Sequence, residues 1–338
     1  MPNNHLISVI IPVYNGEKFI EGALENIKKQ KLDIPLEIIF VDNNSKDHSF
    51  EVINNVALKE KNIKVFKELK KGAAAARNKG FNQSKGDYIY FYDVDDYLFE
   101  DTIISLLNAL KSYPEAQAAF GKMMKVSLEE LKNNTIFESN NNYNQRFYNP
   151  PYWGMAWHKD LTKVVGPPAF LYKREVFSKI GLYEENLLTG QDTALDIKLG
   201  MSLPVVQLDR CVYAYVKHNN STTQKTKKKE SVERMQWPRL TQSHLPFYLN
   251  NQKTLPLEFY QVLEKRIFSN MGKIIKQTNR IGDRLRIKLK LEKDIKPVKL
   301  PFVINLYLLL LIIIPASIIL KFYLYYLLPN FSSTFYKN

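Results

Sequence analysis

The run YIYFYDVDD at residues 88–96 joins a strand to a group of acids, and it decides the fold. Its first five residues are aromatic or β-branched, a composition that predicts a β-strand. Asp93, Asp95 and Asp96 follow, so three carboxylates crowd the carboxyl end of that strand. Like charges this close repel one another, and a bound cation would relieve the repulsion. Aspartate also caps helices, and the run alone leaves both uses open.

Strands and helices alternate before this run. Apolar patterning predicts strands at 7–11, 36–41 and 63–66, and helices at 17–30, 47–59 and 73–84. Such alternation is typical of an α/β protein with a mostly parallel sheet and helices on both faces. Ligands of these sheets bind beyond the carboxyl ends of the strands. The turns at that edge are therefore expected to carry the chemistry.

Two further turns at this edge have side chains suited to a nucleotide. Pro12 and Tyr14 lie in the turn after the first strand, and the Tyr14 ring is suited to stacking on a base. Asp42 and Asn43 follow the second strand, where they either cap the next helix or contact a base or ribose. Arg77, in the third helix, offers a cation. We expect these groups to converge on one crevice.

Length and charge bound the possible functions. The 338 residues suffice for one large domain with an appendage or for two modest domains. The 48 basic and 34 acidic side chains give a net charge of +14, which indicates nucleic acid, nucleotide phosphates or an anionic membrane as partner. The composition excludes collagen-like and wholly disordered chains. One cysteine, Cys211, and no signal peptide make a cytoplasmic location the expectation.

The C-terminal region has a different composition. Residues 301–320 form an almost uninterrupted apolar run of the length that spans a bilayer, and 322–328 continue it. Residues 280–299 hold eight basic and three acidic side chains, a net charge of +5. The positive-inside rule then predicts that the N-terminal body lies on the cytoplasmic face of the cell membrane. Spanning is preferred, and a shallow embedding bent at Pro315 is the alternative.

The motifs, in their order and spacing, resemble family 2 glycosyltransferases, which are inverting enzymes with a GT-A fold. The matching segments are 8–15, 41–45, 72–80, 93–96 and 171–192. The resemblance is to a bacterial-type enzyme with a C-terminal membrane segment. It implies a Rossmann-like GT-A domain at 5–222, followed by a basic helical juxtamembrane region at 223–299 and a membrane-associated segment at 300–328.

The resemblance also implies roles for individual residues. Asp192 matches the catalytic base, and Asp95, Asp96 and His218 match positions near the Mn²⁺ or Mg²⁺ ion. The nucleotide is expected to contact six residues: Pro12, Tyr14, Asp42, Asn43, Arg77 and Asp93. Gln191 stands where the family usually has Glu, and Asn43 stands where many members have an Asp that contacts uracil. Because of the second departure, the sequence does not indicate which base the donor nucleotide carries.

The implied reaction moves a sugar from a nucleotide-sugar donor to a glycan or glycolipid acceptor in cell-surface polysaccharide synthesis. Asp192 would take the proton of the acceptor hydroxyl. A polyprenyl-phosphate acceptor is the alternative, and it needs no base because the phosphate is already ionised. The ring-rich segment 143–157 suits either sugar stacking or core packing.

Two functions without catalysis fit the sequence less well. A nucleic-acid-binding protein would spread its basic residues along a groove, whereas the charge here is concentrated beside the apolar tail. No nucleic-acid partner is therefore expected. A membrane scaffold without activity would not need the intact acids at 93–96 and at Asp192.

Overall fold

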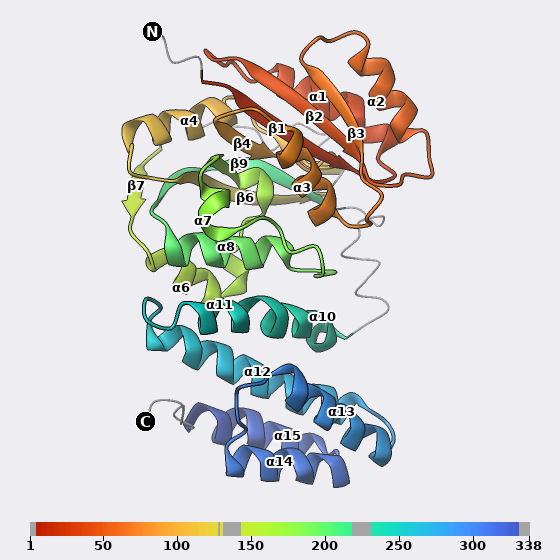
Figure 1. Cartoon of the computed structure of the whole chain (residues 1–338), viewed down its shortest axis with the longest axis vertical. Coiled ribbons are helices and arrows are strands. Elements are labelled where there is room, and N and C mark those ends of the chain that lie inside the picture. Colours follow the sequence, from red (N-terminus) through yellow and green to blue (C-terminus); the bar gives the residue numbers. More distant parts are fainter. Residues whose placement is uncertain (1–4, 128, 131–142, 218–230, 331–338) are drawn as a thin grey trace. The chain divides into compact units, whose positions relative to one another are not determined.

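The computed structural model describes residues 5–127, 129–130, 143–217 and 231–330 (Figure 1). The chain forms two compact units, residues 1–221 and 222–338. The first unit contains a β-sheet with helices packed against it, and the second is built from helices.

Four parallel strands carry the turns that were predicted to bind a nucleotide. β1 (Ile7–Val13), β2 (Leu36–Asp42), β3 (Ile63–Lys67) and β4 (Tyr88–Phe91) lie in the order β3-β2-β1-β4. β1 pairs in parallel with β2 on one side and β4 on the other, so its carboxyl end lies between theirs. β1 is buried along nearly its whole length, which explains its apolar sequence ISVIIPV.

The complete sheet is mixed, which corrects the prediction of a mostly parallel one. β8 (Phe170–Lys173) runs antiparallel to β4 and to β6 (Ala118–Ser127), and β6 is parallel to β9 (Val205–Lys217). β5 (Tyr97–Leu98) and β7 (Gln145–Tyr148) pair antiparallel with β9. Helices α1, α2 and α3 connect β1 to β2, β2 to β3 and β3 to β4, and helical crossovers of this kind make strands parallel.

The helices of the first unit pack close to the sheet. They are α1 (Ile20–Lys28), α2 (Ser49–Ala57), α3 (Ala73–Gln83), α4 (Thr102–Ser112), α6 (Tyr152–Lys159), α7 (Val176–Ile180) and α8 (Gln191–Ser202). α3 contacts β1 and β2. A Cβ atom on Gly80 would lie 2.3 Å from Cγ2 of Ile10, so the absence of a side chain lets this helix approach the strand. The close approach fixes Arg77 relative to the ends of both strands.

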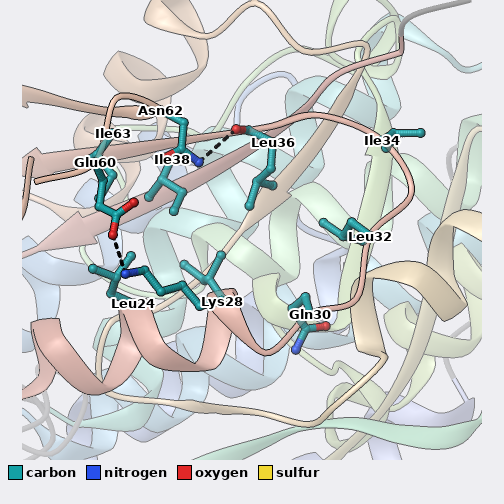
Figure 2. A pocket seen from close by; sticks show the side chains of 11 residues that line it. Leu24, Lys28, Gln30, Leu32, Ile34, Leu36, Ile38, Glu60, Asn62 and Ile63 are labelled. Atoms are coloured by element: carbon teal, nitrogen blue, oxygen red, sulfur yellow. Dashed lines mark hydrogen bonds and ion pairs between the residues drawn. The ribbon is translucent and has the colours of Figure 1, made fainter.

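A pocket of about 250 Å³ lies at the other end of the parallel strands (Figure 2). Its walls come from the end of α1, the 30–36 loop and the beginnings of β2 and β3. Lys28 pairs with Glu60, and Asn62 Nδ2 donates to the Leu36 carbonyl at 3.2 Å. Because these are the amino ends of β2 and β3, the pocket is separate from the predicted crevice.

The second unit is helical. It consists of α10 (Val232–Pro238), α11 (Leu245–Asn250), α12 (Leu257–Gln277), α13 (Ile281–Asp294), α14 (Phe302–Ile313) and α15 (Ser317–Phe322). A π-helical segment, Arg239–His244, joins α10 to α11, and another, Tyr323–Leu327, follows α15. α12 contacts each of the other five helices, so it forms the centre of this unit.

The apolar run 301–320 forms two helices, which corrects the predicted membrane-spanning segment. α14 ends at Ile313 and α15 begins at Ser317. Pro315 lies in the break, because proline lacks an amide donor and disfavours helical geometry in the residue before it. Ile314 is accordingly extended, with φ −122° and ψ 90°. Among the described residues, no helix combines the length and the apolar character needed to cross a membrane.

Two glycines set the distance between α6 and α8. A Cβ atom on Gly200 would lie 2.4 Å from the Gly154 backbone nitrogen and 2.8 Å from a ring carbon of Trp157. We therefore expect Gly200→Ala to push the two helices apart, at a cost of roughly 1–3 kcal/mol, and to lower the melting temperature by about 3 to 10 °C.

Gly22→Ala in α1 is the matched control, because a Cβ atom there meets nothing within 4 Å. This change should raise the melting temperature slightly, since alanine favours a helix by roughly 0.5–1 kcal/mol. Thermal melts of both variants by circular dichroism test the pair. A Gly200→Ala protein as stable as the wild type would show that the helices do not need this close contact.

Candidate active site

The turns that were predicted to bind the nucleotide lie where β1, β2 and β4 end. Hydrogen bonds tie the first two turns together: the Asn15 amide donates to Ser45 Oγ at 3.0 Å, and the Lys46 amide donates to Asn15 Oδ1 at 2.7 Å. Pro12 is half-buried at the end of β1, and Tyr14 exposes 52% of its surface just beyond it. The Tyr14 ring is thus accessible to a planar ligand.

Asp42 and Asn43 are adjacent but have different surroundings. Asp42 is buried, and its Oδ1 has no hydrogen-bond partner among the described residues. Such an oxygen is costly unless a ligand donates to it. The Asn43 amide, in contrast, donates to the carbonyls of Glu68 and Lys70 and accepts from the Gly72 amide at 2.7 Å. Asn43 therefore shapes the loop before α3 and has its amide fully occupied.

Arg77 joins two acids that are 99 residues apart in the sequence. Its Nη2 donates to Asp93 Oδ1 at 2.6 Å and its Nη1 to Asp192 Oδ1 at 3.1 Å, while the guanidinium lies 5.1 Å from the centre of the Tyr183 ring. The side chain is only 4% exposed. Burial disfavours the charge on Arg77, but the two carboxylates outweigh it and raise its pKa. Arg77 is thus a permanent cation that pairs with both acids.

Asp192 lies in the first turn of α8, whose positive dipole end favours a carboxylate. Its side chain is one-third exposed, and the bond from Arg77 is made to Oδ1, one of its two oxygens. Burial raises the pKa of Asp192 above its ordinary value; Arg77 opposes the rise and Asp93 adds to it. A higher pKa makes the carboxylate a stronger base. The neighbouring Gln191 donates its amide to the Leu187 carbonyl and so supports the turn before α8.

The acids at 93–96 do not all face the same way. Asp93 and Asp95 are partly exposed, whereas Asp96 is buried and accepts the Val216 amide of β9 at 3.1 Å. Burial, with the nearby Asp93 and Asp95, raises the pKa of Asp96 well above its usual range. Asp96 therefore connects this turn to β9.

A divalent cation fits the chemistry of Asp93 and Asp95 but has no preformed site in the described residues. No group of three His, Cys, Asp or Glu side chains is arranged there to hold a metal. Mg²⁺ is often bound by only one or two carboxylates together with substrate phosphates. Asp93 and Asp95 could supply those carboxylates. His218 lies outside the described residues, so its predicted role near the metal stays a prediction.

Several residues of the site were not predicted. Asn78 donates to the Tyr183 carbonyl at 2.9 Å and to Glu185 Oε1 at 2.8 Å, and it accepts the Tyr183 amide. Lys70 pairs with the other oxygen of Glu185 at 2.8 Å. These contacts hold the loop that leads to α8 against α3. Asn78 and Glu185 both lie in segments that match the family, which was the available signal.

In the ring-rich segment 143–157, the most buried ring packs in the core. Trp157 is fully buried, with its ring 5.3 Å from that of Phe120 and 5.9 Å from that of Phe170. Tyr152 is exposed and stacks on Tyr148 at 4.6 Å. Core packing thus explains Trp157, and Tyr152 is the ring that stays available for a ligand.

Asp196 is a buried acid that the sequence did not reveal as unusual. It lies one helical turn after Asp192 and is 1% exposed, and its Oδ2 has no hydrogen-bond partner among the described residues. Burial, with Asp192 as a smaller cause, raises the pKa of Asp196 well above its ordinary value. Asp196 therefore keeps its proton to a higher pH than an ordinary aspartate, which disfavours a second negative charge behind Asp192.

This proton makes stability depend on pH. The folded protein keeps it, whereas the unfolded chain loses it above an ordinary aspartate pKa of about 3.9, so stability falls as pH rises. Asp196→Asn resembles the protonated acid and should remove that fall. We expect its melting temperature relative to the wild type to increase from pH 4.5 to pH 8. A difference that is constant or shrinks with pH would mean that Asp196 is ionised in the folded protein.

The sequence is similar to those of known glycosyltransferases. An uncharacterised glycosyltransferase of Haemophilus influenzae is 42% identical over 108 residues, which cover 31% of this chain and 42% of that protein. The GalNAc(5)-diNAcBac-PP-undecaprenol β-1,3-glucosyltransferase of Campylobacter jejuni is 33% identical over 103 residues, 30% of this chain and 33% of its own length. The chain thus matches less than half of either relative.

The fold is found in a solved structure. Residues 1–349 of TarS from S. aureus, in complex with UDP-GlcNAc, superpose with a TM-score of 0.58 at 16% identity over 90% of each chain. At this identity the likeness shows the fold, a GT-A-like α/β fold with a mixed sheet. The family model of glycosyl transferase family 2 matches residues 8–181, just over half of the chain. The protein therefore belongs to glycosyltransferase family 2.

Proposed function

We propose that this glycosyltransferase moves a sugar from a nucleotide-sugar donor to a hydroxyl of a cell-surface glycan or glycolipid, with inversion at the anomeric carbon. The contact of Arg77 with both Asp93 and Asp192 carries the proposal. It holds the candidate base beside the acids of the nucleotide motif, where a donor and an acceptor would meet. We assign this chemistry to residues 5–222.

The donor's nucleoside is proposed to bind over the turns after β1 and β2. Tyr14 offers an exposed ring for stacking, and the unpartnered Oδ1 of Asp42 can accept a hydrogen bond from a base or ribose. Asn43 contributes indirectly, because its amide holds the loop that leads to Arg77. Pro12 fixes the end of β1 beneath this pocket.

The diphosphate is proposed to lie beside Asp93 and Asp95. These two acids would hold Mn²⁺ or Mg²⁺, with Asp96 fixing their turn to β9. When bound, the ion supplies positive charge that offsets the negative charge of the departing diphosphate. Arg77 holds Asp93 in place through their 2.6 Å hydrogen bond, so the turn is positioned before the donor arrives.

Asp192 is proposed to act as the general base. A sugar hydroxyl is a poor nucleophile at neutral pH, so its proton must leave as the new bond forms. The free oxygen of Asp192 accepts this proton, the hydroxyl oxygen bonds to the anomeric carbon, and the bond from that carbon to the diphosphate breaks. The electron pair of the broken bond leaves with the diphosphate. Arg77 keeps the other oxygen of Asp192 in place throughout.

The acceptor is proposed to be linked to lipid, or to a growing surface polymer, at the cytoplasmic face of the membrane. The Campylobacter relative carries a lipid-linked acceptor in its name, and this supports the proposal without defining the sugar. A polyprenyl phosphate is the alternative acceptor. It would not need Asp192 as a base, so the Asp192→Asn variant distinguishes the two kinds of acceptor.

Asp192→Asn keeps the size of the side chain but cannot accept the proton. We expect transfer to fall by roughly 10²- to 10⁴-fold, the usual scale of general base catalysis, with nucleotide affinity nearly unchanged. Transfer rates with a nucleotide-sugar panel and titration calorimetry with UDP, GDP and dTDP measure the two effects. In the wild type, transfer should decline toward acid pH, and this decline should occur at a higher pH than for an ordinary aspartate, because the pKa of Asp192 is raised.

Asp95→Asn is the matched control for this experiment. It should weaken nucleotide binding in Mn²⁺ as well as transfer, and chelation should lower the affinity of the wild type to a similar level. Thermal melts check that both variants fold. Near wild-type transfer by Asp192→Asn would remove Asp192 as the base and favour a phosphate acceptor.

A further inference from the structure

The second unit has an apolar surface that its own packing does not cover. One side of α14 is buried, and α14 contacts α12 and α13. Its other side is equally apolar and exposed: Phe302, Val303, Leu306, Leu309, Leu310 and Ile313. A helix that is apolar on every side is expected to be buried on every side. Some partner outside the described residues is therefore expected to cover this one.

The exposed apolar surface continues beyond the break at Pro315. Ile318, Phe322, Tyr325 and Tyr326 are all exposed, and the Phe322 ring stacks on Tyr326 at 5.5 Å. Phe322 also stacks on Tyr307 of α14 at 5.7 Å, so the two segments present their rings together. Tyrosine rings are common where an apolar phase meets water, because their hydroxyl groups stay hydrated.

α13 adds a second apolar stripe with a basic border. Ile281, Leu285 and Leu289 are spaced four residues apart and are exposed. Exposed cations lie around them along the same segment: Arg280, Arg286, Lys290, Lys293, Lys296 and Lys299. Buried Arg284 fixes α13 to its neighbours, donating to the carbonyls of Thr278 at 3.0 Å and Ile312 of α14. The two surfaces are thus held together.

We propose that α13, α14, α15 and the following turn form one lipid-binding surface that enters a single leaflet of an anionic bilayer. α14 has 12 residues, about 18 Å of helix, which is short of the ~30 Å hydrocarbon core and suits a helix lying in the interface. The apolar side chains meet the acyl chains, and the cations of α13 meet anionic headgroups. The proposal uses no active-site residue, so it is independent of the proposed function.

The charge of this surface favours lipid over a second copy of the chain. Residues 280–299 carry a net charge of +5. A second copy would bring the same cations to the contact, and like charges across an interface are unfavourable. An anionic membrane instead supplies the opposite charge over an extended apolar layer.

Vesicle flotation of the full chain tests the proposal. We expect the protein to float with vesicles of phosphatidylcholine and phosphatidylglycerol in low salt, to bind vesicles of phosphatidylcholine alone much more weakly, and to lose most of this difference in high salt. Two sets of variants separate the contribution of apolar contact to vesicle binding from the contribution of charge.

Leu306→Gln with Ile313→Gln removes apolar contact and should lower vesicle binding by at least about tenfold. Leu58→Gln is the matched control, because Leu58 is 86% exposed in the first unit and should not contribute. Replacing Arg286, Lys290 and Lys293 by Gln should lower binding to anionic vesicles on the order of 100-fold. Its control replaces Lys29, Lys31 and Lys61, exposed cations of the first unit, and should change little.

Titration calorimetry with nucleotide and thermal melts confirm that each variant is folded, and both should match the wild type. A wild-type chain that stays unbound with both kinds of vesicle overturns the proposal. So does a stable dimer that fails to float and that the Leu306 and Ile313 changes convert to monomer, because a second copy would then cover the surface.

Discussion

The hydrogen bonds of Arg77 to Asp93 and Asp192 are the interaction on which the rest of the site depends. A guanidinium that is 4% exposed cannot stay charged without partners, and the two carboxylates supply them. Neither acid would be stable this close to the other without the cation between them. One buried arginine thereby brings together the turn after β4 and the start of α8.

Neighbouring contacts restrict the positions of the elements that carry Arg77 and Asp192. Gly80 lets α3 pack closely against β1, and Asn43 holds the loop that leads into α3. These two contacts fix the position of the helix that carries Arg77. On the other side, Asn78 and Glu185 hold the loop before α8. Burial raises the pKa of Asp196, which disfavours a further negative charge beside Asp192. Electrostatics and packing therefore specify the same arrangement.

The four parallel strands were predictable because buried strands need continuous apolar runs, and the acids were predictable because they follow those runs directly. The directions of the strands in the second half of the sheet were not predictable, because β8 pairs with β4 and β6, which lie far from it in the sequence, and a local apolar pattern does not contain such pairings. The roles of Asn43 and Asp196 depend on contacts with distant segments, which a local reading does not contain. In the tail, the length of the apolar run led to the preferred prediction of a membrane span, whereas the break between α14 and α15 lies at Pro315, where the alternative placed a bend.

The central claim is a one-step displacement in which Asp192 activates the attacking hydroxyl. Water can replace the acceptor in slow hydrolysis of the donor, so NMR of the first-formed free sugar, recorded before mutarotation, reads the stereochemistry without knowledge of the acceptor. With an α-linked nucleotide sugar that the enzyme hydrolyses, a single displacement predicts release of the β-anomer. Release of the α-anomer would require a different mechanism and would contradict the role given to Asp192.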